Sequence, residues 1–145
     1  MSTVTAIAEG IRDVLAGLSW VDAASIDDFL PAATAPNVAA FVVPFEQTSA
    51  VLVDSLSAGE ITLIHTLTVE FWIQHRNGSA AETMQRARDA GTLAIAALLA
   101  HDGDGYTVAR EYQFEERITP QFVSHLNVPW LITTLRVPVE NEVIT

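Results

Sequence analysis

The chain has 145 residues, of which 50% are hydrophobic and 17% charged, so its composition predicts one globular domain over residues 1–145. It contains no cysteine, which excludes disulfides, thiolate metal sites and cysteine nucleophiles. The formal net charge is −11, and all seven basic residues are arginine. We therefore do not expect the chain to bind the phosphate backbone of nucleic acids, although DNA could slide past so acidic a surface.

The N-terminal segment 3–18 carries apolar residues at helical spacing and predicts an amphipathic helix capped by Ser2 or Thr3. Its apolar face consists of Ile7, Ile11, Val14, Leu15 and Leu18. The segment has no early basic cluster and no uniformly apolar run. We therefore expect neither a signal peptide nor a membrane span, and a mature protein that starts near Met1 in a cytoplasm.

The next forty residues are less regular. Residues 19–37 hold two prolines and no clean period, which predicts a loop with a short turn of helix around 25–29. The run "VAAFVVP" at 38–44 predicts a buried strand ended by Pro44. Residues 46–60 are ambiguous: their centre could form a strand, but we favour an irregular excursion or a loose hairpin arm.

Residues 61–75 alternate apolar and polar side chains without a break and predict a strand roughly 50 Å long, at about 3.3 Å per residue. A typical strand has only about five or six residues. A strand that outruns the core of a small domain must curl or find partners elsewhere, because its extra length exposes unpaired backbone groups that invite pairing with another chain.

A second helix is predicted over residues 80–100. Ser79 and Glu82 form a capping box at its start, Glu82 and Arg86 are spaced for an ion pair, and Gly103 or Gly105 ends it. The face predicted to point inward is rich in small residues, which lets a helix lie close to a sheet: Met84, Ala87, Gly91, Ala94, Ile95 and Leu98.

The C-terminal third predicts strands at 106–117 and 128–140, joined by a link at 118–127. Pro129 and Pro138 favour an edge position or a bulge for the last strand. The order of elements predicts the α+β class: a mainly antiparallel sheet with one long strand, packed by a central helix and an N-terminal helix.

No constellation of catalytic or metal-binding residues stands out. His65 and His75 share a strand face but lie about 33 Å apart, so they cannot share a metal ion within one chain. The stretch "HDGDGY" at 101–106 fails the calcium-loop pattern at three positions, and the neighbouring Glu115 and Glu116 should point to opposite faces of a strand. No known phosphate, nucleotide or hydrolase motif is present. We therefore expect no cofactor, no metal and no enzymatic activity.

Four segments together carry a resemblance to a known family. "AFVVPFE", "LSAGEITLIHTLTVEFWIQHRNGSAAETMQRARDAGTLAIAALLA", "VAREYQFEERI" and "VPWLITTLRVPVE" follow one another in this order. In pattern and order, over roughly residues 1–141, the chain resembles the tail terminator (tail completion) proteins of long-tailed bacteriophages. Where many members have a glycine-rich hairpin before the long strand, this chain has "VLVDSLSAGE", with a single glycine.

The resemblance implies a structural virion protein located in the tail or neck and assembled in the cytoplasm of the bacterial host. Such proteins form a homohexameric ring that caps the tail tube and offers a docking surface to the head–tail connector or stopper protein. DNA passes through the ring without specific binding, which the charge of −11 fits. No membrane, cofactor or catalytic residue is implied.

Two long links are the predicted contacts with neighbouring subunits or the tube, residues 45–60 and 117–127. Both hold apolar side chains that a monomer gains little by exposing, although these side chains could instead pack into their own subunit. The predicted interface residues are Glu46, Gln47, Val51, Leu52, Asp54, Arg117, Gln121, Phe122, Val123 and His125.

Other interpretations stay open at the level of sequence. The chain could be another neck or connector protein, or a tail-tube subunit. From a different class, it could be a small cytoplasmic ligand-binding α+β domain with a pocket lined by Phe71, Trp72 or Trp130. A third possibility is an enzyme whose catalytic carboxylates follow no recognisable pattern.

Overall fold

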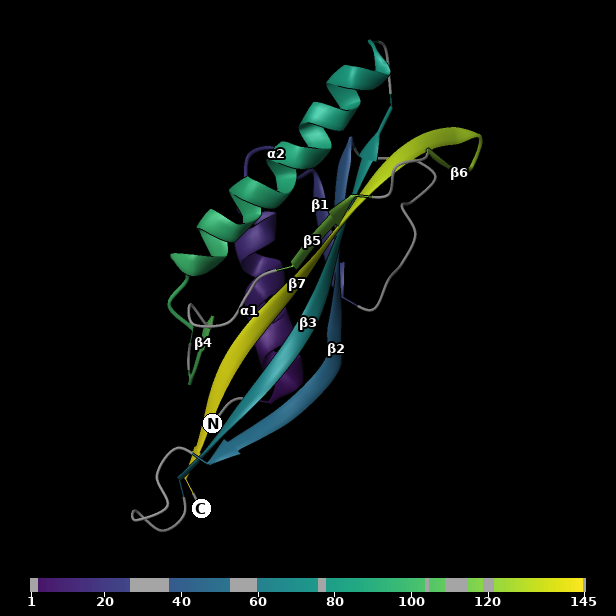
Figure 1. Cartoon of the computed structure of the whole chain (residues 1–145). Helices are drawn as coiled ribbons and strands as arrows, with labels where there is room; N and C mark the ends of the chain where they lie inside the picture. The colour runs from purple at the N-terminus through teal and green to yellow at the C-terminus, as the bar shows by residue number, and fades with distance from the viewer. Residues whose placement is uncertain are drawn as a thin grey trace.

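The computed structural model describes residues 3–26, 37–52, 60–75, 78–103, 105–108, 115–118 and 122–144. These residues form two helices on one face of a curled mixed sheet (Figure 1), so the predicted α+β class is confirmed. The elements in chain order are α1 (Val4–Ala16), β1 (Ala23–Ile26), β2 (Val38–Leu52), β3 (Glu60–Gln74), α2 (Ala80–Leu99), β4 (Tyr106–Val108), β5 (Glu115–Ile118), β6 (Val123–His125) and β7 (Val128–Ile144).

The strands follow the order β1-β2-β3-β7-β4, and β5 and β6 also pair with β7. β1 runs parallel to β2, and the other pairings are antiparallel. β1 corrects the prediction of a loop with a helical turn from residue 25, because Ala23–Ile26 is extended and pairs with Ala39–Val42. Its entry is fixed by Asp22, whose carboxylate accepts a hydrogen bond from the Val38 amide at 3.0 Å. So short a strand, on one edge, leaves no period in the sequence.

Three strands are long, not one. β2 and β3 have 15 residues each and β7 has 17. β3 is a single extended segment, close to the predicted bounds, but β7 pairs with it from Glu60 to Gln74 and β2 pairs with it on the other side. The prediction of one long strand is therefore wrong, and the length of β3 does not require a second copy of the chain.

β2 does not end at Pro44, as the sequence predicted. It runs on to Leu52, and the expectation of an irregular excursion from residue 46 is wrong as far as Leu52; residues 53–59 lie outside the described part. The pairing with β3 shifts register between Val43 and Gln47, and Pro44 falls in this bulge. Proline is tolerated there because a bulged residue has no ladder hydrogen bond to donate.

β7 lies inside the sheet, although its prolines predicted an edge. The amide of His75 donates to the carbonyl of Pro129 at 2.9 Å. The backbone N–H and C=O groups of odd-numbered residues of β7 therefore point toward β3. The backbone nitrogen of Pro138, an even-numbered residue, therefore points away from β3, toward the side of β7 on which β4 and β5 pair. There the described pairing of β5 with β7 ends at Arg136 and that of β4 begins at Val139, so Pro138 interrupts no ladder between described residues.

Both helices bury small or branched side chains against the same face of the sheet. In α1 these are Ile7, Ala8, Ile11 and Leu15. The helical spacing predicted Ile7, Ile11 and Leu15 but not Ala8, and the predicted Val14 and Leu18 are half-buried at the margin of the core. In α2 the buried residues are Thr83, Ala87, Ala90, Gly91, Ala94 and Leu98. The prediction missed Thr83 and Ala90, and it counted Met84 and Ile95, which are half-buried at the margin of the core.

Polar contacts fix α2 on the sheet. The Ser79 hydroxyl accepts from the Glu82 amide at 3.2 Å, as the capping prediction required. The Thr133 hydroxyl of β7 donates to the carbonyl of Ala87 at 2.8 Å. Arg86 donates to the carbonyl of Gln74 at 2.9 Å rather than pairing with Glu82.

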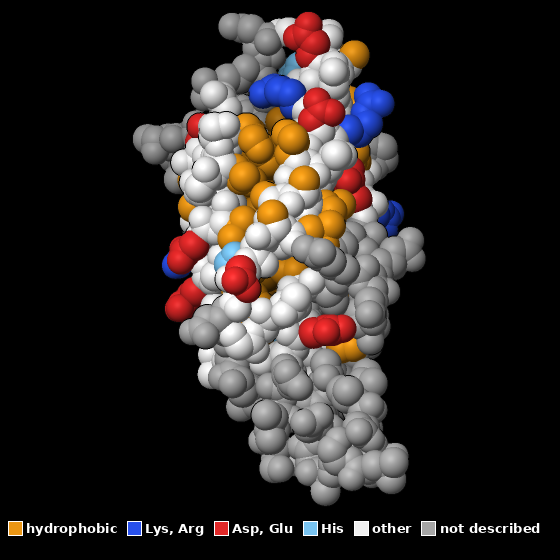
Figure 2. All heavy atoms as spheres, turned by 90° about the vertical axis from the view of Figure 1, so that its left-hand side faces the viewer, with side chains coloured by type: hydrophobic (Ala, Val, Ile, Leu, Met, Phe, Trp, Pro, Cys, Tyr) orange, Lys and Arg blue, Asp and Glu red, His pale blue; other side chains and the backbone are white. Residues whose placement is uncertain are grey.

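The predicted strand at 106–117 is two strands, β4 and β5, and residues 109–114 lie outside the described part. The predicted link at 118–127 contains β6, which forms a hairpin with β7. Figure 2 shows the helix-bearing side: hydrophobic side chains lie along the middle of the described surface, most of the arginines in view lie near its upper end, and carboxylates are spread from top to bottom.

Candidate assembly surface

The face of the sheet away from the helices has a hydrophobic cluster of its own, which we call the outer-face cluster. Its buried members are Ala39, Phe41, Trp72 and Trp130, and Val123, Val128 and Ile132 pack against them. The rings of Trp72 and Trp130 lie 6.2 Å apart and those of Phe41 and Trp72 lie 6.4 Å apart, both near edge-to-face. Neither indole N–H has a hydrogen-bond partner within the described residues, so packing rather than polar contact stabilises the cluster.

The β6–β7 hairpin borders this cluster and carries an unusual turn. Leu126 and Asn127 have φ of 53° and 62°, the conformation of a two-residue type I′ turn. Asparagine suits such a turn, but leucine in the left-handed region costs about 1–2 kcal/mol. Leu126 is nevertheless 56% exposed, and Phe122 beside the hairpin is 40% exposed. We call these two side chains the hairpin tip.

The predicted interface residues of segment 117–127 divide into two kinds. Arg117 is exposed on β5, and Phe122 is exposed with its ring 4.8 Å from that of His75. Val123 is half-buried against the outer-face cluster, and the ring of His125 lies 6.1 Å from Trp72. Gln121 lies outside the described residues. Segment 117–127 therefore both supports its own subunit and presents apolar surface.

The predicted interface residues of segment 45–60 lie at the opposite end of the sheet. Glu46, Gln47, Val51 and Leu52 belong to β2, and Asp54 is outside the described residues. We call Gln47–Leu52, which pairs with β3 beyond the bulge, the distal half of β2, and Val38–Val43 its proximal half.

The structure does not bring the two predicted groups together. β6 is level with residues 128–130 of β7, whereas Leu52 is level, through Ile61 of β3, with Val143. At about 3.3 Å per residue, these two levels lie about 40 Å apart along β7. The predicted interface residues therefore fall in two separate regions rather than at one site.

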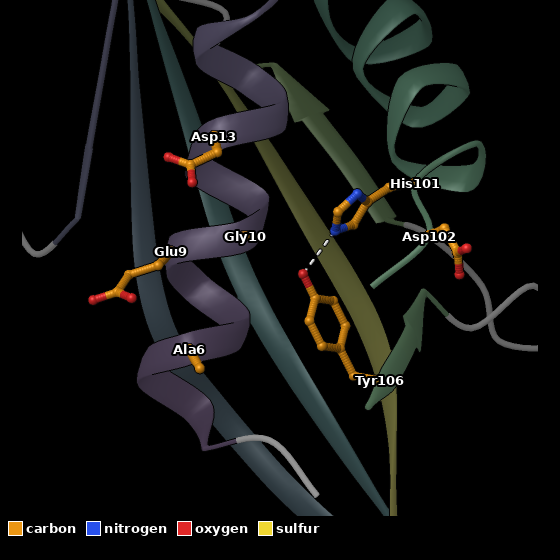
Figure 3. A pocket seen from close by; sticks show the side chains of 7 residues that line it. All are labelled: Ala6, Glu9, Gly10, Asp13, His101, Asp102 and Tyr106. Atoms are coloured by element: carbon orange, nitrogen blue, oxygen red, sulfur yellow. Dashed lines mark hydrogen bonds between the residues drawn. The ribbon is translucent and has the colours of Figure 1, made fainter. Parts of the chain in front are cut away.

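A shallow pocket of about 390 Å³ lies between α1 and the connection from α2 to β4 (Figure 3). The ring of His101 and the hydroxyl of Tyr106 share a hydrogen bond of 2.7 Å at its centre. Glu9 and Asp13 project from α1 away from this pair, so the carboxylates do not converge. Within the described residues no three potential ligands are arranged to hold a metal ion.

The remaining titratable groups are dispersed. His65 is buried beside Asn141, and burial lowers its pKa, while His75 bonds to the Thr83 hydroxyl at 2.7 Å. Burial raises the pKa of Glu70 and of Glu116. The backbones of Glu115 and Glu116 pair with Arg136 and Leu135 of β7.

The ligand pocket of the alternative interpretation is not formed by the side chains named for it. Phe71 is fully buried in the helix-side core, and Trp72 and Trp130 are buried in the outer-face cluster. All three pack against other side chains of the chain, and none of them lines the pocket formed by described residues around His101 and Tyr106.

No protein-family model matches the chain, and no curated protein sequence matches it. Neither described helix combines the length and the hydrophobicity needed to cross a membrane.

Proposed function

We propose that the chain is a structural virion protein that assembles on the end of a phage tail tube as a ring, which the sequence resemblance implies is a hexamer. In this proposal the ring joins the tube to the head–tail connector, and DNA passes through it without specific binding. The observation that carries the proposal is the separation of two contact regions, the hairpin tip and the distal half of β2, at opposite ends of one long sheet. A ring that binds a tube as well as its own neighbours needs separate surfaces for these contacts.

The order of elements supports the proposal without testing it. An N-terminal helix, long strands, a helix of 20 residues and closing strands follow one another over the same segments that carry the resemblance. We assign the hairpin tip to the tail-tube protein, because its apolar side chains are exposed on the chain alone and would be buried by docking. We assign the distal half of β2 to the neighbouring subunit.

The direct experiment measures mass and position. Light scattering of the purified chain, with and without tail tubes, measures the mass that the chain adds to the tubes. This mass should be a whole-number multiple of 15.7 kDa, as a closed ring requires. Electron microscopy should place it at the tube end that faces the head. A strict monomer that leaves tube ends bare would contradict the proposal, and binding along the tube wall or at another neck position would favour a different virion role.

Leu126→Asn separates docking from stability. Asparagine tolerates the left-handed conformation of this turn, so the variant should be more stable than the wild type by about 1 kcal/mol. It should nevertheless bind tubes more weakly, because it removes an exposed apolar contact. Urea denaturation and co-sedimentation with tubes measure the two effects.

Leu93→Asn is the matched control, since Leu93 is 49% exposed on α2 and lies outside the hairpin tip. It should leave tube binding unchanged. Equal loss of binding in both variants would contradict the role of the hairpin tip.

A further inference from the structure

β2 has an edge that the described chain pairs only in part. β1 pairs with Ala39–Val42, and no described strand pairs with β2 on that edge beyond Val42. From Gln47 to Leu52 the strand is joined to β3 alone. Figure 1 shows this part of β2 as the outermost strand at the lower end of the sheet.

The register determines which backbone groups face this open edge. The Gln74 amide donates to the carbonyl of Asn37 at 2.9 Å. The backbone N–H and C=O groups of even-numbered residues of β3 therefore point toward β2. β3 keeps an uninterrupted register with β7, so the same alternation holds at Thr66, Ile64 and Thr62.

The partners of these residues are Gln47, Ser49 and Val51, which therefore bond to β3. Thr48, Ala50 and Leu52 turn their N–H and C=O groups to the open edge. The distal half of β2 thus presents a row of backbone donors and acceptors of the kind that another strand satisfies.

The usual protection of an edge stops short of this segment. Proline, bulges and charged side chains keep exposed edges from pairing with other chains. Pro44 and the bulge lie before Gln47, and the sequence "QTSAVL" contains no charged residue between Glu46 and Asp54. In a chain with a net charge of −11, an uncharged edge is where two copies can approach with the least repulsion.

We infer that the edge of Gln47–Leu52 is where one copy of the chain joins the next, by backbone hydrogen bonds to a strand of the second copy. The inference rests on the proposed self-assembly and names its interface. It also transfers to β2 the role that the sequence assigned to β3, whose two edges are filled within the chain.

Ala50→Pro tests the inference. Proline removes an outward donor and obstructs an approaching strand, but it leaves the bonds to β3 in place. The variant should unfold near the wild-type midpoint while the concentration needed for half-assembly rises about tenfold or more, as for the loss of roughly 1.4 kcal/mol of interface energy. Ala50→Ser keeps the N–H and is the matched control, which should assemble normally.

Ser49→Pro checks the assignment of direction, because it loses a bond to β3 and should lower stability. Thr48→Pro repeats the test at a second outward position if Ala50→Pro fails to fold. Normal assembly by folded Ala50→Pro and Thr48→Pro would overturn the inference and leave the proposed ring standing. A wild-type chain that stays monomeric with and without tubes would instead overturn the proposed function.

Discussion

The two halves of β2 differ in how their edges are paired. The proximal half is paired on both edges, and its side chains alternate between the helix-side core and the outer-face cluster. Among the described strands, the distal half is paired on one edge only. Pro44 and the bulge mark the point of change. One continuous strand thus serves as core in its first half and as an available edge in its second.

Under the proposed assembly, this difference separates folding from association. Buried apolar side chains dominate folding energy, whereas an edge contributes backbone groups that become useful only when a partner arrives. Substitutions in the proximal half should therefore affect folding, and those at the outward positions of the distal half should affect association.

The largest effect is expected for Phe41→Ala in the proximal half. Phe41 is 4% exposed and packs edge-to-face on Trp72, so the cavity should lower the free energy of unfolding by about 3–5 kcal/mol. Urea denaturation measures this. A loss below about 1 kcal/mol would show that the outer-face cluster is not part of the folding core, and the contrast between the halves would break down.

A smaller effect is expected for Gly10→Ala in α1. A Cβ on Gly10 would overlap the hydroxyl oxygen of Tyr106, whose ring is buried and whose hydroxyl is hydrogen-bonded to His101. Because the ring cannot move aside cheaply, the variant should lose about 1–3 kcal/mol of stability. Thermal unfolding would report it, with assembly at permissive temperature unchanged.

Gly91→Ala in α2 is its matched control. The Cβ there would meet the carboxylate of Glu116, which ends a flexible side chain and can swing away. Alanine also favours a helix over glycine by about 1 kcal/mol, so this variant should be as stable as the wild type or slightly more so. Equal destabilisation by both alanines would contradict the packing described for Tyr106.

The smallest effect concerns Glu70, which pairs with Phe41 across the proximal half. Burial raises the pKa of Glu70 above its ordinary 4.5, so the folded state prefers the protonated carboxyl. Its contribution to stability is most favourable below the unfolded pKa and is lost as pH rises through the folded pKa. Glu70→Gln should therefore raise the denaturation midpoint at pH 7 and give no gain in acid. A gain of equal size at both pH values would exclude titration as its cause.

The parts of the fold that were predictable from sequence are those with a strong local period. The existence of α1 and α2, most of the buried face of α1, the Ser79 cap and the alternation of β3 follow directly from side-chain spacing. The extension of β2 past Pro44 and the interior position of β7 were not predictable, because the pairing of β2 with β3 around the bulge and of β7 with β3 is a property of the assembled sheet.

The candidate surface was predictable only in outline. The apolar character of Phe122 is visible in the sequence, and so was the uncharged run after Glu46. The turn at Leu126–Asn127 was missed because leucine is a poor signal for positive φ. Val123 and His125 pack at the outer-face cluster, whereas Phe122 is exposed. This difference depends on which residues Trp72 and Trp130 contact, and the sequence pattern of one strand does not contain that information.

Hydrogen exchange of individual backbone amides in the distal half of β2 tests the central claim most directly. In the free chain, the amides of Ser49 and Val51 should be protected by β3, and those of Thr48, Ala50 and Leu52 should exchange rapidly. On assembly with tail tubes the three outward amides should become protected as well. Rapid exchange at these three positions in the assembled protein would contradict the account.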